Sequence, residues 1–405
     1  MGKDIDRSDR KSDRIKNMIR IALGQSKMVT KPISGILHVV VYVGFIIINI
    51  ELLEIVIDGI LGSHRFFSKY ISTSLYNFLI GFFEFFALLV LIAVIVFWIR
   101  RNIVKIKRFL SAEMKGWPKL DADNILYFEI VLMLLFLSMN ATDLILQNRE
   151  YYNQAGFFPI SSFLVPLFDS FSTETLYYME RSFWWLHIIG ILFFLNYLYY
   201  SKHLHILLAF PNTYYANLEA KGKFGVLETV KKEVLLMFYP EKAQDENTSQ
   251  VEKLGASDVL DLNWVQLMNA YSCTECGRCT SECPANLTGK KLSPRKIMMD
   301  TRDRLEEVSR NISKNNGVFK DDGNQLLDNF ISREELWACT SCNACVDACP
   351  INIDPLSIIM RMRQYLIMEE SSAHSDLNNM MNNIENNGAP WPFNQQDREL
   401  WIQEP

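Results

Sequence analysis

Several common signals are missing from this sequence. Its 405 residues carry a formal net charge of -5, so the chain lacks the basic excess that holds nucleic acids, and we expect no nucleic-acid partner. It has no G-x-G-x-x-G motif, which argues against a bound dinucleotide. We find no cleavable signal peptide at its start. Long apolar runs are almost absent after residue 210, and we therefore predict a membrane half followed by a soluble half.

Cysteine is scarce as well, because none occurs before residue 273 and all eight lie in two short runs. The first cysteine run reads Cys273-Thr-Glu-Cys276-Gly-Arg-Cys279-Thr-Ser-Glu-Cys283-Pro284. The second cysteine run reads Cys339-Thr-Ser-Cys342-Asn-Ala-Cys345-Val-Asp-Ala-Cys349-Pro350. Both follow C-x2-C-x2-C-x3-C-P, the spacing that holds two 4Fe-4S clusters, with the fourth cysteine of each run on the other cluster.

This crossed pattern predicts the ligands of both clusters. The first cluster takes Cys273, Cys276, Cys279 and Cys349, and the second takes Cys339, Cys342, Cys345 and Cys283. Structural zinc also uses C-x2-C pairs, but it closes with four ligands per site and has no use for a third cysteine and a crossed fourth. Disulfides need an oxidising compartment. We therefore favour two 4Fe-4S clusters over zinc or disulfides.

Four apolar segments in the first half each reach the length of about 20 residues that crosses a hydrocarbon core. They cover residues 33–57, 74–99, 123–146 and 182–201. Because four such runs are hard to bury in a soluble core, we predict that they span a membrane. The fold class that follows is mainly α: a four-helix transmembrane bundle, then a helical ferredoxin-like domain with two clusters.

Composition divides the chain into five parts. Residues 1–31 form a polar arm, expected to be mobile or interfacial, and residues 32–206 form the transmembrane domain. An amphipathic connector and a polar linker occupy 207–256. The cysteine domain covers 257–370, and an Asn-rich tail, 371–405, is expected to dock a partner.

Lys and Arg residues set the predicted orientation in the membrane. They gather between the second and third spans and after the fourth span, whereas the other two connections hold few. Both termini are therefore expected in the cytoplasm, with the bundle in the inner membrane of a bacterium. This orientation puts the cysteine domain in a reducing compartment, where thiolates survive as ligands.

Five of the six histidines lie in or beside the predicted spans, where ionisable groups are costly and therefore candidates for function. His38 and His205 lie at the same inner depth and are the predicted axial ligands of one heme b, although His203 could replace His205. His187 lies near the outer start of the fourth span, about five helical turns from His205. A second, outer heme on His187 with His64 is left open.

Acidic residues inside the spans are candidates for moving protons to or from a quinone. Glu84 lies about 15 Å into the second span by helical rise and is the predicted quinone or proton residue. Glu51, Glu54 and Asp143 close their spans, and we expect them to be solvated at the outer surface.

The histidine segments resemble those of a known cytochrome. The stretch His187…Ser201-Lys-His-Leu-His205 and the pair Leu37-His38 are similar to spans of the respiratory nitrate reductase gamma subunit, a diheme quinol-oxidising cytochrome b. The resemblance implies heme b in residues 32–206 and quinone as the substrate. That family has a second histidine ten positions after the first, where this chain has Ile48, so an outer heme would be held differently.

The soluble half resembles the iron-sulfur subunit of heterodisulfide reductase and related membrane-bound Fe-S oxidoreductases. Thr288-Gly-Lys-Lys-Leu-Ser-Pro-Arg295 and Leu336-Trp-Ala-Cys339-Thr-Ser-Cys342 carry this similarity. Many relatives continue into a cysteine-rich domain with CCG motifs, for which no cysteine remains in this sequence. The resemblance therefore implies a separate cytoplasmic partner that carries the CCG domain or a flavin.

These observations predict a membrane electron-transfer subunit of a quinone-linked Fe-S oxidoreductase complex. Electrons pass, in a direction that the sequence does not set, between membrane quinone, heme b, two 4Fe-4S clusters and the cytoplasmic partner. Two alternatives stay open at this point. The membrane half could be a heme-free anchor for an Fe-S relay, or the chain could be a redox-sensing scaffold whose clusters report the redox state.

Overall fold

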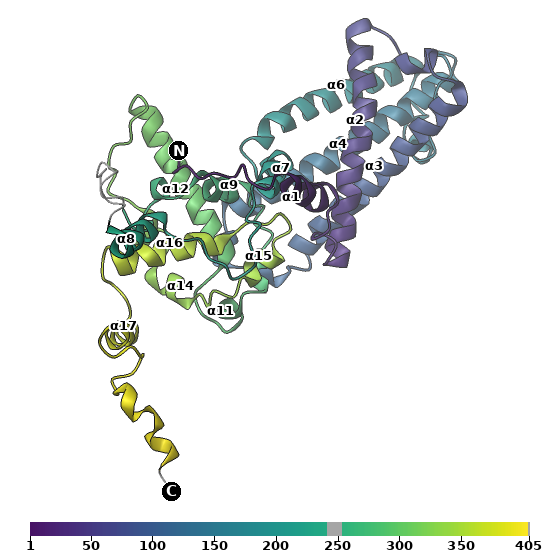
Figure 1. Ribbon diagram of the computed structural model, residues 1–405. Coiled ribbons are helices and arrows are strands. Elements are labelled where there is room, and N and C mark those ends of the chain that lie inside the picture. Colours follow the sequence, from purple (N-terminus) through teal and green to yellow (C-terminus); the bar gives the residue numbers. More distant parts are fainter. Residues whose placement is uncertain (241–252, 404–405) are drawn as a thin grey trace.

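The computed structural model describes residues 1–240 and 253–403 and is built almost entirely from helices. A bundle of four long helices forms one end of the molecule, and the helical domain with both cysteine runs forms the other (Figure 1). No β-strand occurs in the described residues, where two isolated bridges join Lys3 to Asn263 and Leu327 to Ile331.

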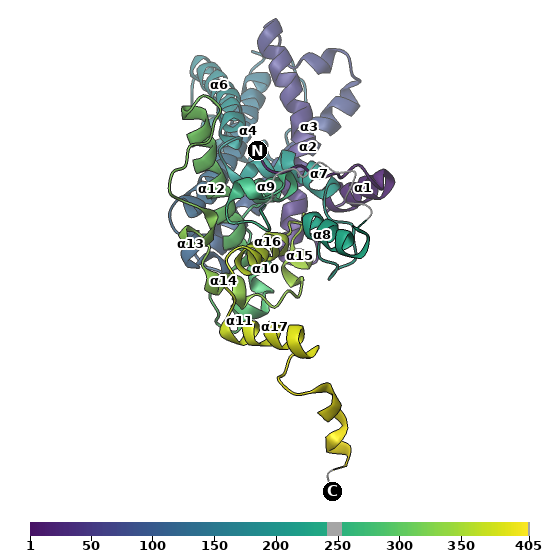
Figure 2. The ribbon, with the colours of Figure 1, turned by 60° about the vertical axis from the view of Figure 1, so that its left-hand side comes forward.

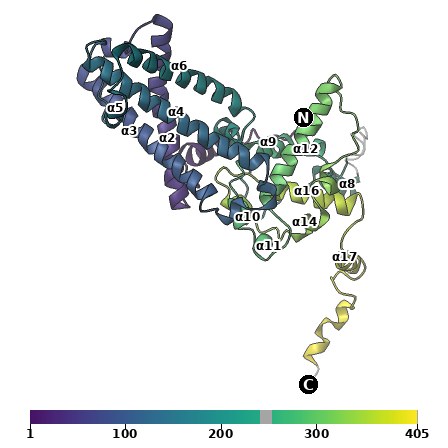
Figure 3. The same ribbon diagram turned by 180° about the vertical axis from the view of Figure 1, so that it is seen from behind.

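The long helices are α2 Pro32–Leu61, α3 Thr73–Asn102, α4 Trp117–Asn148 and α6 Thr173–Leu198. Within the described residues, these four are long and apolar enough to cross a membrane. Helix α2 packs on α3, α3 on α4, and α4 on α6, as the view from behind in Figure 3 shows. At 26 to 32 residues each, they exceed the about 20 that a hydrocarbon core requires, so in a membrane they would tilt or extend beyond it.

The number of helices agrees with the predicted spans, but their ends differ. Helix α6 begins nine residues earlier than predicted, because the hydroxyl of Ser172 caps it by accepting a hydrogen bond from the N–H of Thr175 at 3.2 Å. Helix α2 begins with Pro32 and ends before Gly62, whose φ of +63° suits a glycine at a helix C-terminus. We call the end of the bundle next to the cysteine domain proximal and the opposite end distal.

The N-terminal arm is folded and packed rather than mobile, and its expected place at a membrane interface stays a prediction. It contains helix α1 Lys11–Met18 and the π-helical turn η1 Ile19–Leu23. The buried guanidinium of Arg14 donates to the carbonyls of Tyr214 and Ala216 at 3.2 and 3.1 Å. The indole N–H of Trp264 donates to the carbonyl of Ile5 at 3.2 Å. Hydrogen bonds to free carbonyl groups therefore hold an arm that has too few apolar residues to form a core.

Two separate helices form the connector between the bundle and the cysteine domain. They are α7 His205–Tyr214 and α8 Glu228–Phe238. Most of the predicted polar linker, 241–252, lies outside the described residues.

The cysteine domain is a small helical unit around an apolar core that includes Leu262, Ile297, Leu336 and Met362. Its helices are α9 Trp264–Ser272, α10 Arg278–Ser281, α11 Pro284–Leu287, α12 Pro294–Lys314, α13 Leu326–Asn329, α14 Arg333–Ala338, α15 Ala344–Ala348 and α16 Pro355–Met368. The tail extends away from this unit as α17 Ser375–Asn387 and the 3-10 helix η9 Gln395–Ile402 (Figure 2).

Short helices fill the remaining connections. They are η2 Phe66–Lys69, η3 Lys107–Phe109, η4 Ala112–Met114, η5 Ser161–Leu164, α5 Val165–Phe168, η6 Lys202–Leu204 and η8 Val259–Asp261.

Candidate functional site: two cysteine runs and the buried polar groups of the bundle

The two cysteine runs have the same local architecture. Each follows a helix that starts with a capping box, Asn263 with Gln266 for α9 and Ser332 with Glu335 for α14. Each first cysteine is the C-terminal cap of that helix. Two residues later the backbone has a positive φ, 56° in both runs, and a second positive φ follows after two more residues.

The second positive φ explains which residue types follow the second cysteine of each run. The residue there is Gly277 in the first run, at +72°, and Asn343 in the second, at +60°. Glycine and asparagine are the residues that tolerate this left-handed conformation best. In the second run, the turn lets the N–H of Ser341 donate to the sulfur of Cys339 at 3.4 Å. Two residues between cysteines are therefore enough to bring their sulfurs to one side, because the backbone turns back around the first sulfur.

The fold brings the eight cysteines together in the crossed grouping that the sequence predicts. A small cavity is lined by Cys339, Cys342 and Cys345 from the second run and by Cys283 from the first. Cys279 interacts electrostatically with Cys273, Cys276 and Cys349, and also with Cys345 of the other group. Within the described residues, no three His, Cys, Asp or Glu side chains converge closely enough to hold one metal ion.

Burial makes these thiols hard to ionise without a compensating charge. It raises the pKa of Cys273 to about 12 and that of Cys349 to about 11. A buried thiolate becomes stable when a metal centre supplies the opposite charge. The donor set therefore fits an iron-sulfur cluster, which binds one thiolate at each of four irons.

The first cysteine run lies against the proximal end of the bundle. Glu275, between its first two cysteines, forms ion pairs with Lys202 at 2.5 Å and with Arg302 at 2.8 Å. Arg278, between the second and third, donates to the carbonyls of Lys27 and Met28, both at 3.1 Å, just before α2. Side chains of the run itself therefore attach it to the membrane half.

A second joint between the two halves was not predicted from the sequence. Arg295, fully buried at the start of α12, donates to the carbonyl of Arg108 at 2.7 Å and to the carboxylate of Glu113 at 2.8 Å. Both partners lie between α3 and α4. Burial by itself would raise the pKa of Glu113, but hydrogen bonds and the charge of Arg295 hold it below its usual value.

Three histidines gather at the proximal end, and we call them the histidine cluster. His38 lies two turns into α2, and His203 and His205 lie just after α6. The rings of His203 and His205 are 5.7 Å apart between centroids, and His38 interacts electrostatically with both. Burial, with the neighbouring His205 and His38, lowers the pKa of His203 to about 3. At pH 7 its imidazole is therefore neutral, which is the form that binds metals.

The nitrogen atoms of the histidine cluster suit a metal ligand. The Nδ1 atoms of His38 and His203 are buried and have no hydrogen-bond partner. Nδ1 of His205 lies 3.0 Å from the carbonyl oxygen of Lys202. When Nδ1 of His205 donates a hydrogen bond to that carbonyl oxygen, its Nε2 atom stays free and the ring is held in one orientation, as in many metal-binding histidines. The structure thus brings together both predicted heme ligands and the residue named as their alternative.

The two histidines considered for an outer heme have separate neighbours. His187 lies in the middle of the bundle, about 21 Å of helical rise from Thr173. Its Nδ1 is 3.1 Å from the carbonyl oxygen of Leu132 on α4. His64 lies at the distal end, donates to Asp143 at 2.9 Å and stacks on Tyr152 with 4.1 Å between ring centroids. His187 lies farther from the start of α6 than the predicted span placed it, because α6 begins earlier, and its depth in a membrane stays a prediction.

The distal end contains a buried network around Arg65, which the sequence did not single out. Arg65 donates to Asp143 at 2.9 Å, to Asn140 at 2.8 Å and to Glu51 at 3.2 Å. Glu51, Glu54 and Asp143 are all buried. The expectation that these acids are solvated was wrong, because the loop after α2 folds Arg65 back over the helix ends.

Glu84 belongs to the same network. Its carboxylate is fully buried and accepts hydrogen bonds from the backbone N–H groups of Ile160 and Ser161 at 2.9 and 3.1 Å, and from the side chain of Asn140 at 3.1 Å. Two polar atoms beside it, Oε2 of Glu51 and Oγ of Ser161, are buried without a hydrogen-bond partner. Glu84 is therefore tied to the distal loop, with unused hydrogen-bonding capacity next to it.

Comparisons with known proteins agree with the cysteine chemistry. The sequence family described as a 4Fe-4S dicluster domain matches residues 272–353. The chain is 30% identical to the probable iron-sulfur-binding oxidoreductase FadF of Bacillus subtilis, over 94% of this chain and 54% of that relative. It is 25% identical to the EtfAB:quinone oxidoreductase of Syntrophomonas wolfei, over 99% of this chain and 55% of the relative.

A shorter match comes from a heterodisulfide reductase. One component of the dihydromethanophenazine:CoB–CoM heterodisulfide reductase of Methanosarcina mazei is 26% identical over 37% of this chain and 37% of its own length. No solved structure matches the chain. The chain spans about half the length of the two long relatives. The comparisons thus relate the chain to iron-sulfur oxidoreductases, among them a quinone oxidoreductase and a heterodisulfide reductase.

Proposed function

We propose that the chain carries electrons between membrane quinone and a redox partner, by holding heme b in the bundle and two 4Fe-4S clusters in the cysteine domain. His38 and His205 bind the heme iron. Cys273, Cys276, Cys279 and Cys349 bind the first cluster, and Cys339, Cys342, Cys345 and Cys283 bind the second. When bound, these groups supply one-electron transfer, and the protein contributes their position and surroundings.

The observation that carries this proposal is the contact between the histidine cluster and the first cysteine run. Lys202, next to His203, forms the ion pair with Glu275 inside that run. Arg278 of the run interacts electrostatically with His38. The second group of cysteines is farther along the domain, and Cys342 is exposed there. This order supports a relay from the bundle to the first cluster, then to the second, then to a partner.

Quinone chemistry needs groups that exchange protons, and the Glu84 network is suited to that task. One arginine, Arg65, lies among four buried carboxylates, those of Glu51, Glu54, Glu84 and Asp143. Carboxylates that outnumber their cations in a site shielded from water cannot all be ionised together. Some of them therefore hold protons that a quinone nearby could take up or replace. The name of the Syntrophomonas relative, which includes quinone, supports the same substrate.

The partner and the location follow from the same observations. We propose a cytoplasmic partner with a flavin or a CCG-type cysteine domain, and an EtfAB-type protein is the first candidate because that relative is named for it. The basic residues of 100–119 and 202–232 lie at the proximal end, which favours a proximal end in the cytoplasm. The exposed tail, 371–405, is a candidate docking element. We place the bundle in the bacterial inner membrane, with both termini on the cytoplasmic side.

Reduction of the clusters by a quinol tests this function. The full chain is purified without oxygen, placed in nanodiscs and mixed with a reduced quinone, and cluster reduction is followed by electron paramagnetic resonance. We expect both clusters to be reduced in the wild type. In Cys276→Ala, the second cluster should still be reduced by dithionite but no longer by quinol. In the matched variant Cys342→Ala, quinol should still reduce the first cluster.

Three results would contradict the proposal in different ways. Clusters that respond to dithionite but never to quinol in the wild type would favour the redox-sensing scaffold. Quinol reduction of the second cluster in Cys276→Ala would show that the order of the relay is wrong. A wild-type protein with both clusters and no reduced b-type absorption bands would be the heme-free anchor.

A further inference from the structure

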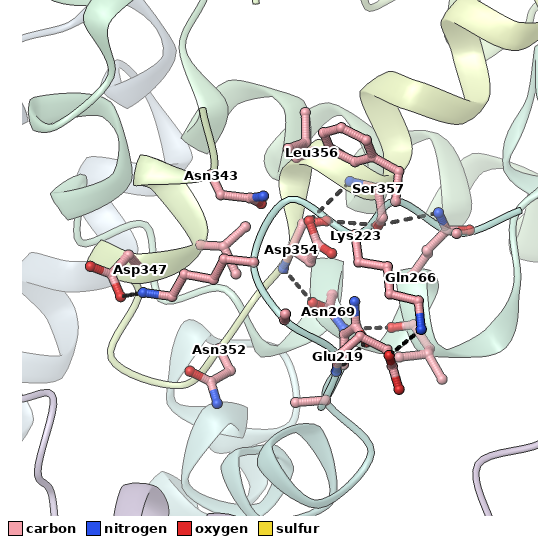
Figure 4. A pocket seen from close by; sticks show the side chains of 18 of the residues that line it. Glu219, Lys223, Gln266, Asn269, Asn343, Asp347, Asn352, Asp354, Leu356 and Ser357 are labelled. Atoms are coloured by element: carbon pink, nitrogen blue, oxygen red, sulfur yellow. Dashed lines mark hydrogen bonds and ion pairs between the residues drawn. The ribbon is translucent and has the colours of Figure 1, made fainter. Parts of the chain in front are cut away.

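A polar pocket lies where four parts of the chain meet, beside the second cysteine run. Its volume is about 480 Å³, and its walls come from the N-terminal arm, the loop 216–225, α9 and the segment from Asn343 to Gln364. Figure 4 shows Glu219 and Lys223 from the loop on one side and Asp347 and Asn352 on another. Pockets of about 300–1,000 Å³ are typical for small ligands.

The pocket has a surplus of positive charge. Six cationic side chains line it, together with three acidic ones. The cations are Arg7, Arg20, Lys27, Lys221, Lys223 and Arg361. The acids are Glu219, Asp347 and Asp354. This surplus stands out in a chain whose formal net charge is -5.

Among the described residues, the two loop lysines are the pocket cations that form ion pairs, although Arg7 also interacts electrostatically with Asp9, Asp354 and Glu219. Lys221 pairs with Asp347, and Lys223 pairs with Glu219 at 2.5 Å. The third acid, Asp354, accepts the N–H of Ser357 at 2.9 Å and so caps α16. Arg7, Arg20, Lys27 and Arg361 form no ion pair in the described part of the chain, and the Nε atom of Arg7 is buried without any hydrogen-bond partner.

No ion pair in the described residues compensates the partial burial of Arg7 and Arg361. Burial lowers the pKa of Arg7, and the charge of Arg14 adds to that effect. Burial lowers the pKa of Arg361 as well, and its hydrogen bonds go to neutral groups, the side chain of Gln364 and the carbonyl of Val226. Partly buried guanidinium groups without an ion pair are stabilised by an anion that supplies both charge and acceptor oxygens.

We propose that this pocket binds a phosphate-bearing anion of about mononucleotide size. Arginine side chains offer paired donors that match phosphate oxygens, and lysines add point charges. The loop that carries Lys221, Gly222 and Lys223 borders the pocket, and Gly222 has a φ of +89° with open space beside its Cα atom. Phe224 and Leu356 offer an apolar surface for an organic group attached to the phosphate.

The position of the pocket suggests what its occupant does. Asn343 and Asp347 of the second cysteine run form part of the wall, and Lys27 donates to the carbonyl of Val346 in that run at 3.3 Å. A bound anion would tie the arm and the loop 216–225 to the cysteine domain and would change the electrostatic potential around it. The proposal is independent of heme and quinone, because none of its residues belongs to the histidine cluster or to the Glu84 network.

Direct binding measurements test the proposal on the full chain in nanodiscs without anionic lipid. The probes are ADP, FMN and inorganic phosphate, and, as a lipid source of the same chemistry, short-chain phosphatidylglycerol. The variants are Arg361→Gln and Arg20→Gln, the second of which removes an exposed charge that forms no ion pair with any described residue. The matched control is Arg310→Gln on α12, an exposed arginine outside the pocket that pairs with Glu306.

We expect saturable binding that weakens about 10- to 100-fold in Arg361→Gln, as for the loss of one charge-assisted hydrogen bond. Arg20→Gln should weaken it less, and Arg310→Gln should leave it unchanged. Binding of ADP or FMN identifies a soluble ligand, and binding of phosphatidylglycerol alone identifies a lipid headgroup. The proposal is wrong if no probe binds, or if binding is equal in Arg361→Gln and in the control while both variants keep the wild-type cluster absorption.

Discussion

The two ends of the bundle place polar groups in an apolar environment in opposite ways. At the proximal end, burial favours the neutral form of His203 and His205, and the Nδ1 atoms of His38 and His203 have no partner. At the distal end, Arg65 and its acids form a dense network in which most polar atoms are satisfied by each other. Unpartnered buried nitrogens are costly, and those of the proximal end suit a bound group, whereas the unpartnered oxygens of Glu51 and Ser161 lie within the distal network.

This difference suggests different tasks. The proximal end offers neutral ligands to a group that brings its own charge, as a heme iron does. The distal end provides charges that already balance in part, with an excess of carboxylates that can hold protons. Electron transfer and proton exchange would therefore take place at different ends of the bundle. The predictions below test this contrast, beginning with the largest effect.

Removing a histidine of the proximal end should abolish heme binding completely. His38→Ala and His205→Ala each delete one proposed axial ligand, so the reduced-minus-oxidised difference spectrum of the purified protein should lose its b-type bands. His187→Ala is the matched control, because it removes a buried histidine of the same bundle that already has a backbone partner. If both proximal variants keep the b-type bands, the pairing of His38 with His205 is wrong. If His205→Ala alone keeps the bands, His203 is the second axial ligand in place of His205.

Removing the charge at the centre of the distal network should strongly destabilise the bundle. Arg65→Gln leaves Glu51 and Asp143 buried without their cation, and breaking such a buried pair costs about 3–5 kcal/mol. The measurement is the free energy of unfolding in mixed micelles. The control is Arg149→Gln at the same end of the bundle, whose ion pair with Asp169 leaves the acid exposed, and there we expect about 1 kcal/mol or less. Equal losses in the two variants would contradict a buried distal network.

The heme spectrum of Arg65→Gln sharpens the comparison further. If the two ends act separately, this variant should keep its b-type bands under conditions where it remains folded. Quinol-dependent reduction of the clusters should then slow, because the carboxylates around Glu84 lose the charge that organises them. The assignment of tasks to the two ends is wrong if folded Arg65→Gln protein loses its heme but reduces its clusters with quinol at the wild-type rate. That result would link the distal end to heme binding and not to proton exchange.

Features of the fold and of the candidate site could be predicted from the sequence where they are formed by residues close together in the chain, and less well where distant residues form them. The grouping of the cysteines followed from spacing, because a turn with two positive φ values, such as Glu275 with Gly277, brings neighbouring sulfurs together. The pairing of His38 with His205 on one heme, inferred from equal depth along two helices, stays a prediction, although the fold places the two histidines within electrostatic reach of each other. Arg65 was missed, because its role depends on a loop that closes over the ends of two helices, α2 and α4. The joint between Arg295 and Glu113, which are 182 residues apart, left no local pattern either.

That joint gives the smallest predicted effect and a test by pH. Glu113 accepts from the buried Arg295 and is itself nearly buried, so Glu113→Gln should cost about 2 kcal/mol, the usual range for a hydrogen bond to a charged group. The pKa of Glu113 is lower in the folded protein than its usual 4.5. Its contribution to stability is therefore complete above pH 4.5 and is lost as the pH falls through the lowered pKa.

The wild type and Glu113→Gln should accordingly differ by a constant amount between pH 7 and about pH 5.5, and the difference should shrink only below about pH 4.5. The measurement is thermal unfolding of the cysteine domain, followed by cluster absorption across this range of pH. Because Arg295 joins the two halves of the molecule and belongs to neither end's polar cluster, the heme bands should be unaffected. A difference that already changes between pH 7 and pH 6 would mean that a group other than Glu113 governs the joint.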